Sequence, residues 1–145
     1  MNIRPLHESD FKSYIRLMNS FRPIQADISS EQFSSLVRRM MSCGTILVAI
    51  DNGSVIGSVT VLLEQKLVHN LAVYGHIEDV IVRKDQRRQG VGTALMTAAI
   101  EYTKKEECYK TTLVCSKDVV PFYVQAGFET RGICMSYWRP KLTSS

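Results

Sequence analysis

Apolar residues recur every three or four positions in two stretches of the N-terminal third. A short strand is expected at Asn2–Leu6, followed by a helix that begins near Glu8. The inward positions of this helix are Phe11, Tyr14, Ile15 and Met18. Such spacing places the apolar side chains on one face, so the helix packs against a core.

A second helix follows a loop at Arg22–Ile28. Ser29 and Gln32 have the spacing of a capping box, in which each side chain bonds the backbone N–H of the other residue. The helix ends at Gly44. Its apolar face comprises Phe33, Leu36, Val37 and Met40.

The middle of the chain has the pattern of strands. Two strands are expected at Thr45–Ile50 and Ser54–Leu63, joined by a tight turn at Asn52-Gly53. A third is expected at Gly75–Arg83.

The C-terminal third begins with an amphipathic helix from Gly90 to about Lys105. A strand at Thr111–Cys115, a short helix at Asp118–Ala126 capped by Asp118, and a last strand at Phe128–Trp138 complete the series. This order predicts one α/β (α+β) domain over residues 1–145. Its sheet is expected to be mixed, mostly antiparallel and twisted, with six to seven strands flanked by about four helices.

Length and composition agree with a single globular domain, because the chain has 145 residues of which 45% are hydrophobic. No apolar run is long enough to span a membrane. The N-terminus lacks the charged-then-apolar layout of a secretory signal. We therefore expect an intracellular protein, most simply a cytoplasmic one, with organellar targeting left open.

The cysteines and the charge narrow the choice of ligand. Cys43, Cys108, Cys115 and Cys134 form no Cys-x-x-Cys pair, and their apolar neighbours predict reduced, mostly buried thiols. The histidines stand at no ligand spacing with them, so no metal site is expected. The formal net charge of +4 suits a polyanionic small ligand or, less well, nucleic acid.

The segment Val80–Thr93 has the chemistry of a phosphate-binding site. An apolar strand leads into Arg87-Arg88-Gln89-Gly90-Val91-Gly92-Thr93 at the start of a helix, where unpaired N–H groups attract phosphate. Gly90 and Gly92 let the backbone approach a pyrophosphate closely, and the arginines add charged donors. The spacing differs from both the dinucleotide fingerprint and the P-loop. The simplest alternative is a solvated basic loop.

This Arg-x-x-Gly-x-Gly spacing resembles the acetyl-CoA motif of the GNAT N-acetyltransferase superfamily, and Phe122-Tyr123-x-x-x-Gly127-Phe128 resembles its later motif. From end to end, the chain is similar to the glucosamine 6-phosphate N-acetyltransferase family. The matching segments include Ile3–Leu6, Ile28–Phe33, Glu64–His69, Gly75–Val82 and Cys108–Lys110.

The resemblance implies a GNAT fold and transfer of acetyl from acetyl-CoA to glucosamine 6-phosphate, a step of UDP-N-acetylglucosamine biosynthesis. It also implies a homodimer in which the substrate site is completed across subunits and the C-terminal strand is exchanged or shared. The expected acetyl-CoA contacts are Val80, Ile81, Val82, Arg87, Arg88, Gln89, Gly90, Val91, Gly92, Thr93, Tyr123, Val124 and Gln125. The expected sugar phosphate contacts are Lys66, Leu67, Val68, His69, Glu78, Asp79, Val80, Tyr109 and Lys110, with added cations at Arg139 and Arg22.

The chemistry of these residues agrees with that substrate. Lys66, His69 and Lys110 supply cations for a phosphate, although a surface lysine is usually only solvated. Regular strand alternation would point Glu78 and Asp79 to opposite faces, so that only one of them touches the sugar. His76 is expected to be a packed histidine rather than a catalyst.

The expected mechanism is direct attack of the amine on the thioester, without a covalent enzyme intermediate. The expected catalytic residues are Tyr123, Glu78 and Asp79. Backbone N–H groups of Val80–Val82 would stabilise the oxyanion, and Tyr123 would protonate the leaving thiolate. An acetylated Cys115 is the competing route, but no histidine lies near it in sequence to form a thiolate.

Three positions depart from the family pattern. Val114 and Val119 stand where an acidic residue and an asparagine are usual, and Trp138 stands where an arginine normally reaches the sugar phosphate. These departures leave open a GNAT enzyme that acts on another small amine or a peptide N-terminus. The remaining alternative is a non-catalytic CoA-binding or nucleic-acid-binding module, although the chain lacks a basic stripe interleaved with aromatics.

Overall fold

The computed structural model describes residues 1–24 and 26–140. The chain divides into two compact units, Met1–Leu113 and Val114–Ser145, and each is described by itself. The expectation of a single domain stays a prediction.

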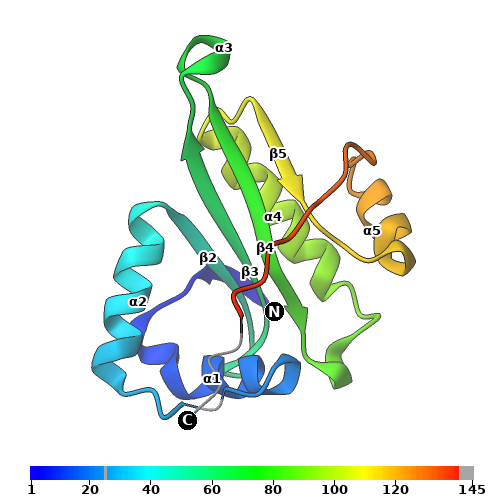
Figure 1. The fold of residues 1–145 in the computed structure, drawn as a ribbon. Coiled ribbons are helices and arrows are strands. Elements are labelled where there is room, and N and C mark those ends of the chain that lie inside the picture. The colour runs from blue at the N-terminus through cyan, green and yellow to red at the C-terminus, as the bar shows by residue number, and fades with distance from the viewer. Residues whose placement is uncertain (25, 141–145) are drawn as a thin grey trace. The chain divides into compact units, whose positions relative to one another are not determined.

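The first unit is built on a five-stranded sheet whose strands are neighbours in chain order. The strands are β1 (Asn2–Pro5), β2 (Gly44–Asp51), β3 (Ser54–Gln65), β4 (Val73–Val82) and β5 (Lys110–Leu113). The first three pairings are antiparallel, and β4 pairs with β5 in parallel. The mostly antiparallel sheet is therefore confirmed (Figure 1). The strand number is below the expected six to seven in the part of the chain that the structure describes.

Three helices of the first unit form where the apolar periodicity places them. They are α1 (Phe11–Phe21), after a 3₁₀ turn at Glu8–Asp10, α2 (Ser30–Ser42) and α4 (Val91–Lys105). The one-turn α3 (Val68–Leu71) was not expected. The capping box of α2 is confirmed, because the Gln32 N–H donates to Ser29 Oγ over 3.1 Å and the Ser29 N–H donates to Gln32 Oε1 over 2.8 Å. On α2, Phe33 and Val37 are buried, whereas Leu36 is exposed, contrary to the expected inward face.

Two helices pack on one face of the sheet and α4 packs on the other. Leu17 of α1 and Phe33 of α2 share a buried cluster with sheet residues that include Ile46 and Ile81. On the opposite face, a Cβ added at Gly57 would lie 2.9 Å from Leu95 Cδ1 of α4. Glycine at this position therefore lets α4 pack directly on the β3 backbone.

A β-bulge interrupts the pairing of β3 with β4. Thr60 lies opposite Glu78, but Ser58 lies opposite Ile81, so β4 carries one extra residue between these pairs. Asp79 within the bulge has a φ of 48°. The expected alternation of Glu78 and Asp79 is wrong for this reason, and both side chains are exposed.

The second unit contains a 3₁₀ turn at Lys117–Val119 and the helix α5 (Val120–Gln125). The expected cap at Asp118 is wrong, because α5 begins at Val120 and its N-cap is Val119. Pro121 in the first turn suits this start, since the proline nitrogen falls where helix N–H groups have no partner.

The expected last strand at Phe128–Trp138 is absent from the described residues. A strand exists only where a neighbouring strand supplies hydrogen bonds, and this segment has no such neighbour. Its apolar residues nevertheless alternate, and Ile133, Met135 and Tyr137 are 92%, 90% and 93% exposed.

The expectation of mostly buried cysteines is also wrong. Cys43, Cys115 and Cys134 are exposed and Cys108 is partly buried, because the exposed three lie at a helix end or outside the sheet. All four are free thiols. Among the described residues, no helix is long and apolar enough to cross a membrane, and no cluster of side chains has the make-up of a metal site.

Candidate active site

The strands β4 and β5, which lie at one edge of the sheet, part midway along β4. Their pairing runs from Tyr74 opposite Lys110 to Ile77 opposite Leu113, and β5 ends there. The segment Glu78–Val82 of β4 continues beyond the end of β5 (Figure 1). Backbone groups on this edge have no β5 partner, so they can bind an extended ligand or a developing oxyanion.

The acetyl-CoA contacts predicted on β4 can be made by the backbone but not by every side chain. Ile81 is buried in the core beneath α1, so its side chain cannot contact a ligand. Val80 and Val82 are half-buried. The backbone of Val80–Val82 is therefore the available binding surface.

The predicted phosphate loop leads from β4 into α4. Gly90 is the N-cap of this fifteen-residue helix, has a φ of 81°, and makes no side-chain capping bond. The first N–H groups of α4 therefore keep their hydrogen-bonding capacity, and the helix dipole adds partial positive charge there. Val91 is buried, so it offers only its backbone.

Arg87 and Gln89 stabilise the loop before α4 by donating hydrogen bonds to backbone carbonyls. Arg87 Nε donates to the carbonyl of Val82 over 3.2 Å, and Gln89 Nε2 donates to the carbonyl of Asp85 over 3.1 Å. Arg88 has a φ of 59° and makes no ion pair among the described residues. Arg87 forms no ion pair among the described residues either, so the charges of both arginines remain available to an anion.

The predicted phosphate cations gather around a tyrosine that the sequence analysis missed. Lys66 Nζ and Lys110 Nζ lie 5.1 Å and 4.9 Å from the centroid of the Tyr74 ring. Tyr109 is stacked with Tyr74 at 5.8 Å, and His69 is stacked with Tyr109 at 4.3 Å. We call Lys66, His69, Tyr74, Tyr109 and Lys110 the tip cluster. An aromatic residue in a strand is ordinary, so no sequence signal distinguished Tyr74.

The turn that carries His69 has unusual backbone geometry. His69, Asn70 and Leu71 have φ values of 53°, 56° and 61°. The neighbouring Leu67 and Val68, also predicted to contact the sugar phosphate, are exposed and apolar. These two can pack against a partner, but they bring no charge to a phosphate.

His76 is not simply packed, as expected, but is hydrogen-bonded through both ring nitrogens. Nε2 lies 2.9 Å from Glu64 Oε1, and Nδ1 lies 3.1 Å from Thr112 Oγ1. The second oxygen of Glu64 lies 3.0 Å from Lys66 Nζ. The bonds from His76 and Lys66 lower the pKa of the Glu64 carboxyl.

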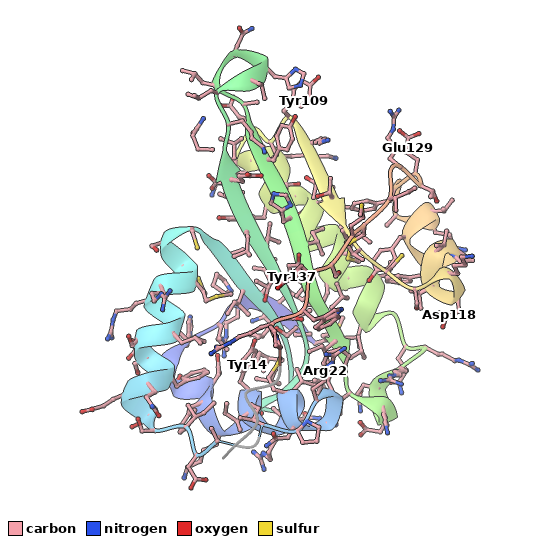
Figure 2. All side chains as sticks on the ribbon, in the orientation of Figure 1. Tyr14, Arg22, Tyr109, Asp118, Glu129 and Tyr137 are labelled. Carbon is pink, nitrogen blue, oxygen red and sulfur yellow. The ribbon has the colours of Figure 1, made fainter. Side chains whose placement is uncertain are left out.

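The structure does not bring all the predicted sugar phosphate residues together within one chain. Tyr74 and Glu78 are four residues apart on β4, which is about 13 Å along the strand. The backbones of Lys66 and His69 lie beyond Val73, although Lys66 Nζ reaches back to within 3.0 Å of Glu64 Oε2. Figure 2 shows Arg22 and Tyr109 at opposite ends of the first unit. Arg22 lies over the Phe21 ring, with its Cζ 5.6 Å from the centroid.

The remaining predicted residues belong to the second unit. Tyr123 makes edge-to-face contacts with Phe122 and Phe128, at centroid distances of 5.0 Å and 6.2 Å. Burial raises the pKa of the Tyr123 phenol, and Cys115 adds to the rise. Val124 and Arg139 are exposed and Gln125 lies at the end of α5. The roles of these residues at the site stay predictions.

Comparison with known proteins agrees with this geometry. Residues 11–128 match the acetyltransferase (GNAT) family. A glucosamine 6-phosphate N-acetyltransferase of Oryza sativa subsp. japonica is 28% identical over 142 residues, covering 94% of this chain and 86% of that enzyme. The enzyme of that name from Candida albicans is 31% identical over 113 residues, covering 75% of this chain and 76% of its own.

A solved structure shows the same fold. The crystal structure of glucosamine-6-phosphate N-acetyltransferase from Arabidopsis thaliana superposes with a TM-score of 0.88 at 27% identity, covering 94% of this chain and 97% of that one. The parted strands, the glycine-capped helix and the family match lead to one conclusion. This chain belongs to the GNAT acetyltransferase family.

Proposed function

We propose that this protein transfers the acetyl group of acetyl-CoA to the amine of D-glucosamine 6-phosphate, giving N-acetyl-D-glucosamine 6-phosphate and CoA. The observation that carries the acceptor assignment is the tip cluster, which concentrates Lys66, His69 and Lys110 around Tyr74. The names of the relatives from rice and Candida albicans support the same acceptor.

Acetyl-CoA is the co-substrate, and no metal is required by the proposed reaction. The diphosphate binds the N–H groups at the start of α4, with Arg88 adding charge. The contacts come from Arg87, Arg88, Gln89, Gly90, Val91, Gly92 and Thr93. The pantetheine arm then follows the edge of β4 that β5 leaves without a partner.

The amine attacks the thioester carbonyl directly. N–H groups at the parted strands stabilise the oxyanion, because they point where negative charge develops. Tyr123 donates a hydrogen bond or proton to the departing thiolate, and Val124 and Gln125 contribute to the coenzyme site. Glu78 and Asp79 hold the sugar hydroxyls. A covalent acetyl-Cys115 is disfavoured, since no histidine lies near that cysteine in sequence to form a thiolate.

The distance between the tip cluster and Glu78 supports a homodimer. The tip cluster surrounds the start of β4, whereas Glu78 lies past its middle, and the tip cluster of one copy completes the site at Glu78 of the other. The exposed, alternating residues Ile133, Met135 and Tyr137 suit a strand that pairs with a second copy. Arg139 at the end of this segment supplies a further cation. Sedimentation at two protein concentrations tests the dimer.

The four free thiols suit a reducing compartment, so we place the protein inside the cell. A second candidate function is acetylation of another small amine or of a peptide N-terminus. Val114 and Val119 favour it, because apolar residues there differ from the family pattern. The cationic tip cluster disfavours peptide amines, since a positively charged site repels a protonated N-terminus.

Thiol release from acetyl-CoA tests the proposal. The purified protein is assayed with glucosamine 6-phosphate, free glucosamine, a peptide panel and no acceptor. Release that requires the sugar phosphate supports the assignment. Equal release with phosphorylated and free glucosamine removes the assigned acceptor, and release only with peptides replaces it by the second candidate.

A further inference from the structure

A row of polar side chains crosses three strands on the sheet face opposite α4. Gly75 faces α4, since a Cβ added there would lie 3.0 Å from Thr103 Cγ2 of that helix. Tyr74, His76 and Glu78 alternate with Gly75 and Ile77, so they face the other way. His76 lies opposite Thr112 on β5 and contacts Glu64 on β3. One imidazole thus links the two neighbouring strands.

The direction of each hydrogen bond follows from the groups involved. The Glu64 carboxylate can only accept, so His76 Nε2 carries the proton of the 2.9 Å contact. In the neutral imidazole, Nδ1 is then an acceptor and receives the Thr112 hydroxyl proton over 3.1 Å. The hydroxyl, imidazole and carboxylate stand in the order that nucleophilic triads use to move a proton.

Thr112 places the hydroxyl end of this row next to the parted strands. It precedes Leu113, the last residue of β5, and the gap beside Glu78–Val82 begins there. The oxygen lone pairs of Thr112 are not used by any hydrogen bond to the described residues. They are free to accept a proton from an amine at the mouth of the gap.

We infer that Thr112, His76 and Glu64 form a proton relay that deprotonates the acceptor amine; this inference rests on the proposed function. The substrate ammonium gives one proton to Thr112 Oγ as the hydroxyl proton of Thr112 passes to His76 Nδ1. The neutral nitrogen forms its bond to the thioester carbon, and the carbon–sulfur bond breaks. The nitrogen loses a second proton as the amide forms, and this loss is matched by the proton that the CoA thiolate takes up. His76 then returns the first proton to solvent.

Two carboxylates and two lysines lie around His76. Glu64 is bonded to it directly, and Glu78 is two residues along β4 on the same face. Lys66 is paired with Glu64, and Lys110 stands at the start of β5. Thr112 is the group that touches substrate in this scheme, whereas His76 and Glu64 act through it.

Thr112→Val tests the relay because it removes the hydroxyl at nearly constant volume. We expect kcat with glucosamine 6-phosphate to fall ~100-fold near neutral pH, with KM for acetyl-CoA unchanged. The defect should shrink at alkaline pH, where the amine is already neutral and needs no acceptor. Thr112→Ser should retain most activity. Thr111→Val, on the same strand but facing α4, is the matched control and should behave as the wild type.

A purely structural role for the row predicts a different result. If Thr112→Val lowers kcat equally at every pH, or leaves kcat unchanged, the relay is wrong. A wild-type protein without transfer to glucosamine 6-phosphate overturns the proposed function instead. The tautomer is read independently of activity by ¹⁵N NMR of the histidine ring. A proton on Nε2 that is lost from this position in Glu64→Gln supports the relay, and a proton on Nδ1 of the neutral wild-type ring overturns it.

Discussion

Ile77 and Ile81, four residues apart on β4, face opposite sides of the sheet. Ile77 follows Gly75 on the α4 face, whereas Ile81 belongs to the cluster that contains Leu17 of α1. The extra residue of the bulge reverses the alternation between them. The same bulge lies where β4 extends past β5, so it shapes the proposed acetyl site.

The bulge depends on the backbone of Asp79, whose φ of 48° is unfavourable for a residue with a Cβ. Asp79→Gly and Asp79→Val both remove the carboxylate, but only glycine accepts this φ without strain. We expect the valine variant to be less stable than the glycine variant by about 1–2 kcal/mol in urea unfolding. Equal stability of the two would show that the bulge relaxes freely.

Gly90 should matter to the coenzyme as well as to the fold. A Cβ added at Gly90 would meet no other atom. Gly90→Ala therefore costs about 1 kcal/mol only because an alanine is strained at a φ of 81°. We expect KM for acetyl-CoA to rise severalfold as well, because the start of α4 shifts. Gly53→Ala, at a φ of 73° in the β2–β3 turn, is the matched control. It should lose similar stability in urea unfolding without a change in that KM.

Removal of the Tyr74 ring should weaken recognition of the phosphate. Tyr74→Ala releases Lys66 and Lys110, which lie within about 5 Å of the ring centroid. We expect KM for glucosamine 6-phosphate to rise ~10-fold, in line with cation–π contributions of about 1–2 kcal/mol. Tyr74→Phe should keep the wild-type KM. Lys104→Ala on α4 is the control for the loss of a positive charge outside the tip cluster. A rise of equal size with free glucosamine would contradict a phosphate role.

Loss of the Tyr123 hydroxyl should slow the departure of the CoA thiolate in the chemical step. In Tyr123→Phe, kcat should fall more than KM for acetyl-CoA rises, because the phenol acts as charge builds on sulfur. Burial raises the pKa of this phenol, so it remains protonated to a pH above its ordinary value near 10. Below about pH 10, the wild-type rate should therefore not fall because Tyr123 loses its hydroxyl proton. Tyr102→Phe on α4 is the control. Unchanged turnover in Tyr123→Phe would show that Tyr123 takes no part in the mechanism.

Asp10 should contribute stability that disappears in acid. Its carboxylate accepts from Arg4 over 2.7 Å and 2.9 Å and from the His7 N–H over 2.8 Å, and the bond from Arg4 lowers its pKa. The contribution is complete above the unfolded-state pKa near 3.9 and is lost as pH falls through the lower folded-state pKa. Asp10→Asn should cost about 1–3 kcal/mol at pH 7. The difference in urea unfolding should narrow below pH 3, and a constant difference would contradict it.

The local features of this protein were determined by the sequence alone. The two N-terminal helices, the capping box at Ser29, the hairpin at Asn52-Gly53 and the glycine-led start of α4 follow from residues close together in the chain. Periodicity and capping are local properties, so one sequence suffices to predict them. The same holds for the family resemblance of the loop before α4.

Other features were decided only by tertiary structure. The bulge at Asp79, the ring of Tyr74 between two lysines, and the bonds from His76 to Glu64 and Thr112 depend on the register of three strands. The apolar segment with Ile133 and Tyr137 has the alternation of a strand but forms none in the described residues. Alternation fixes which face a side chain takes, whereas a strand also needs hydrogen bonds from a neighbour, and sequence periodicity cannot supply that partner.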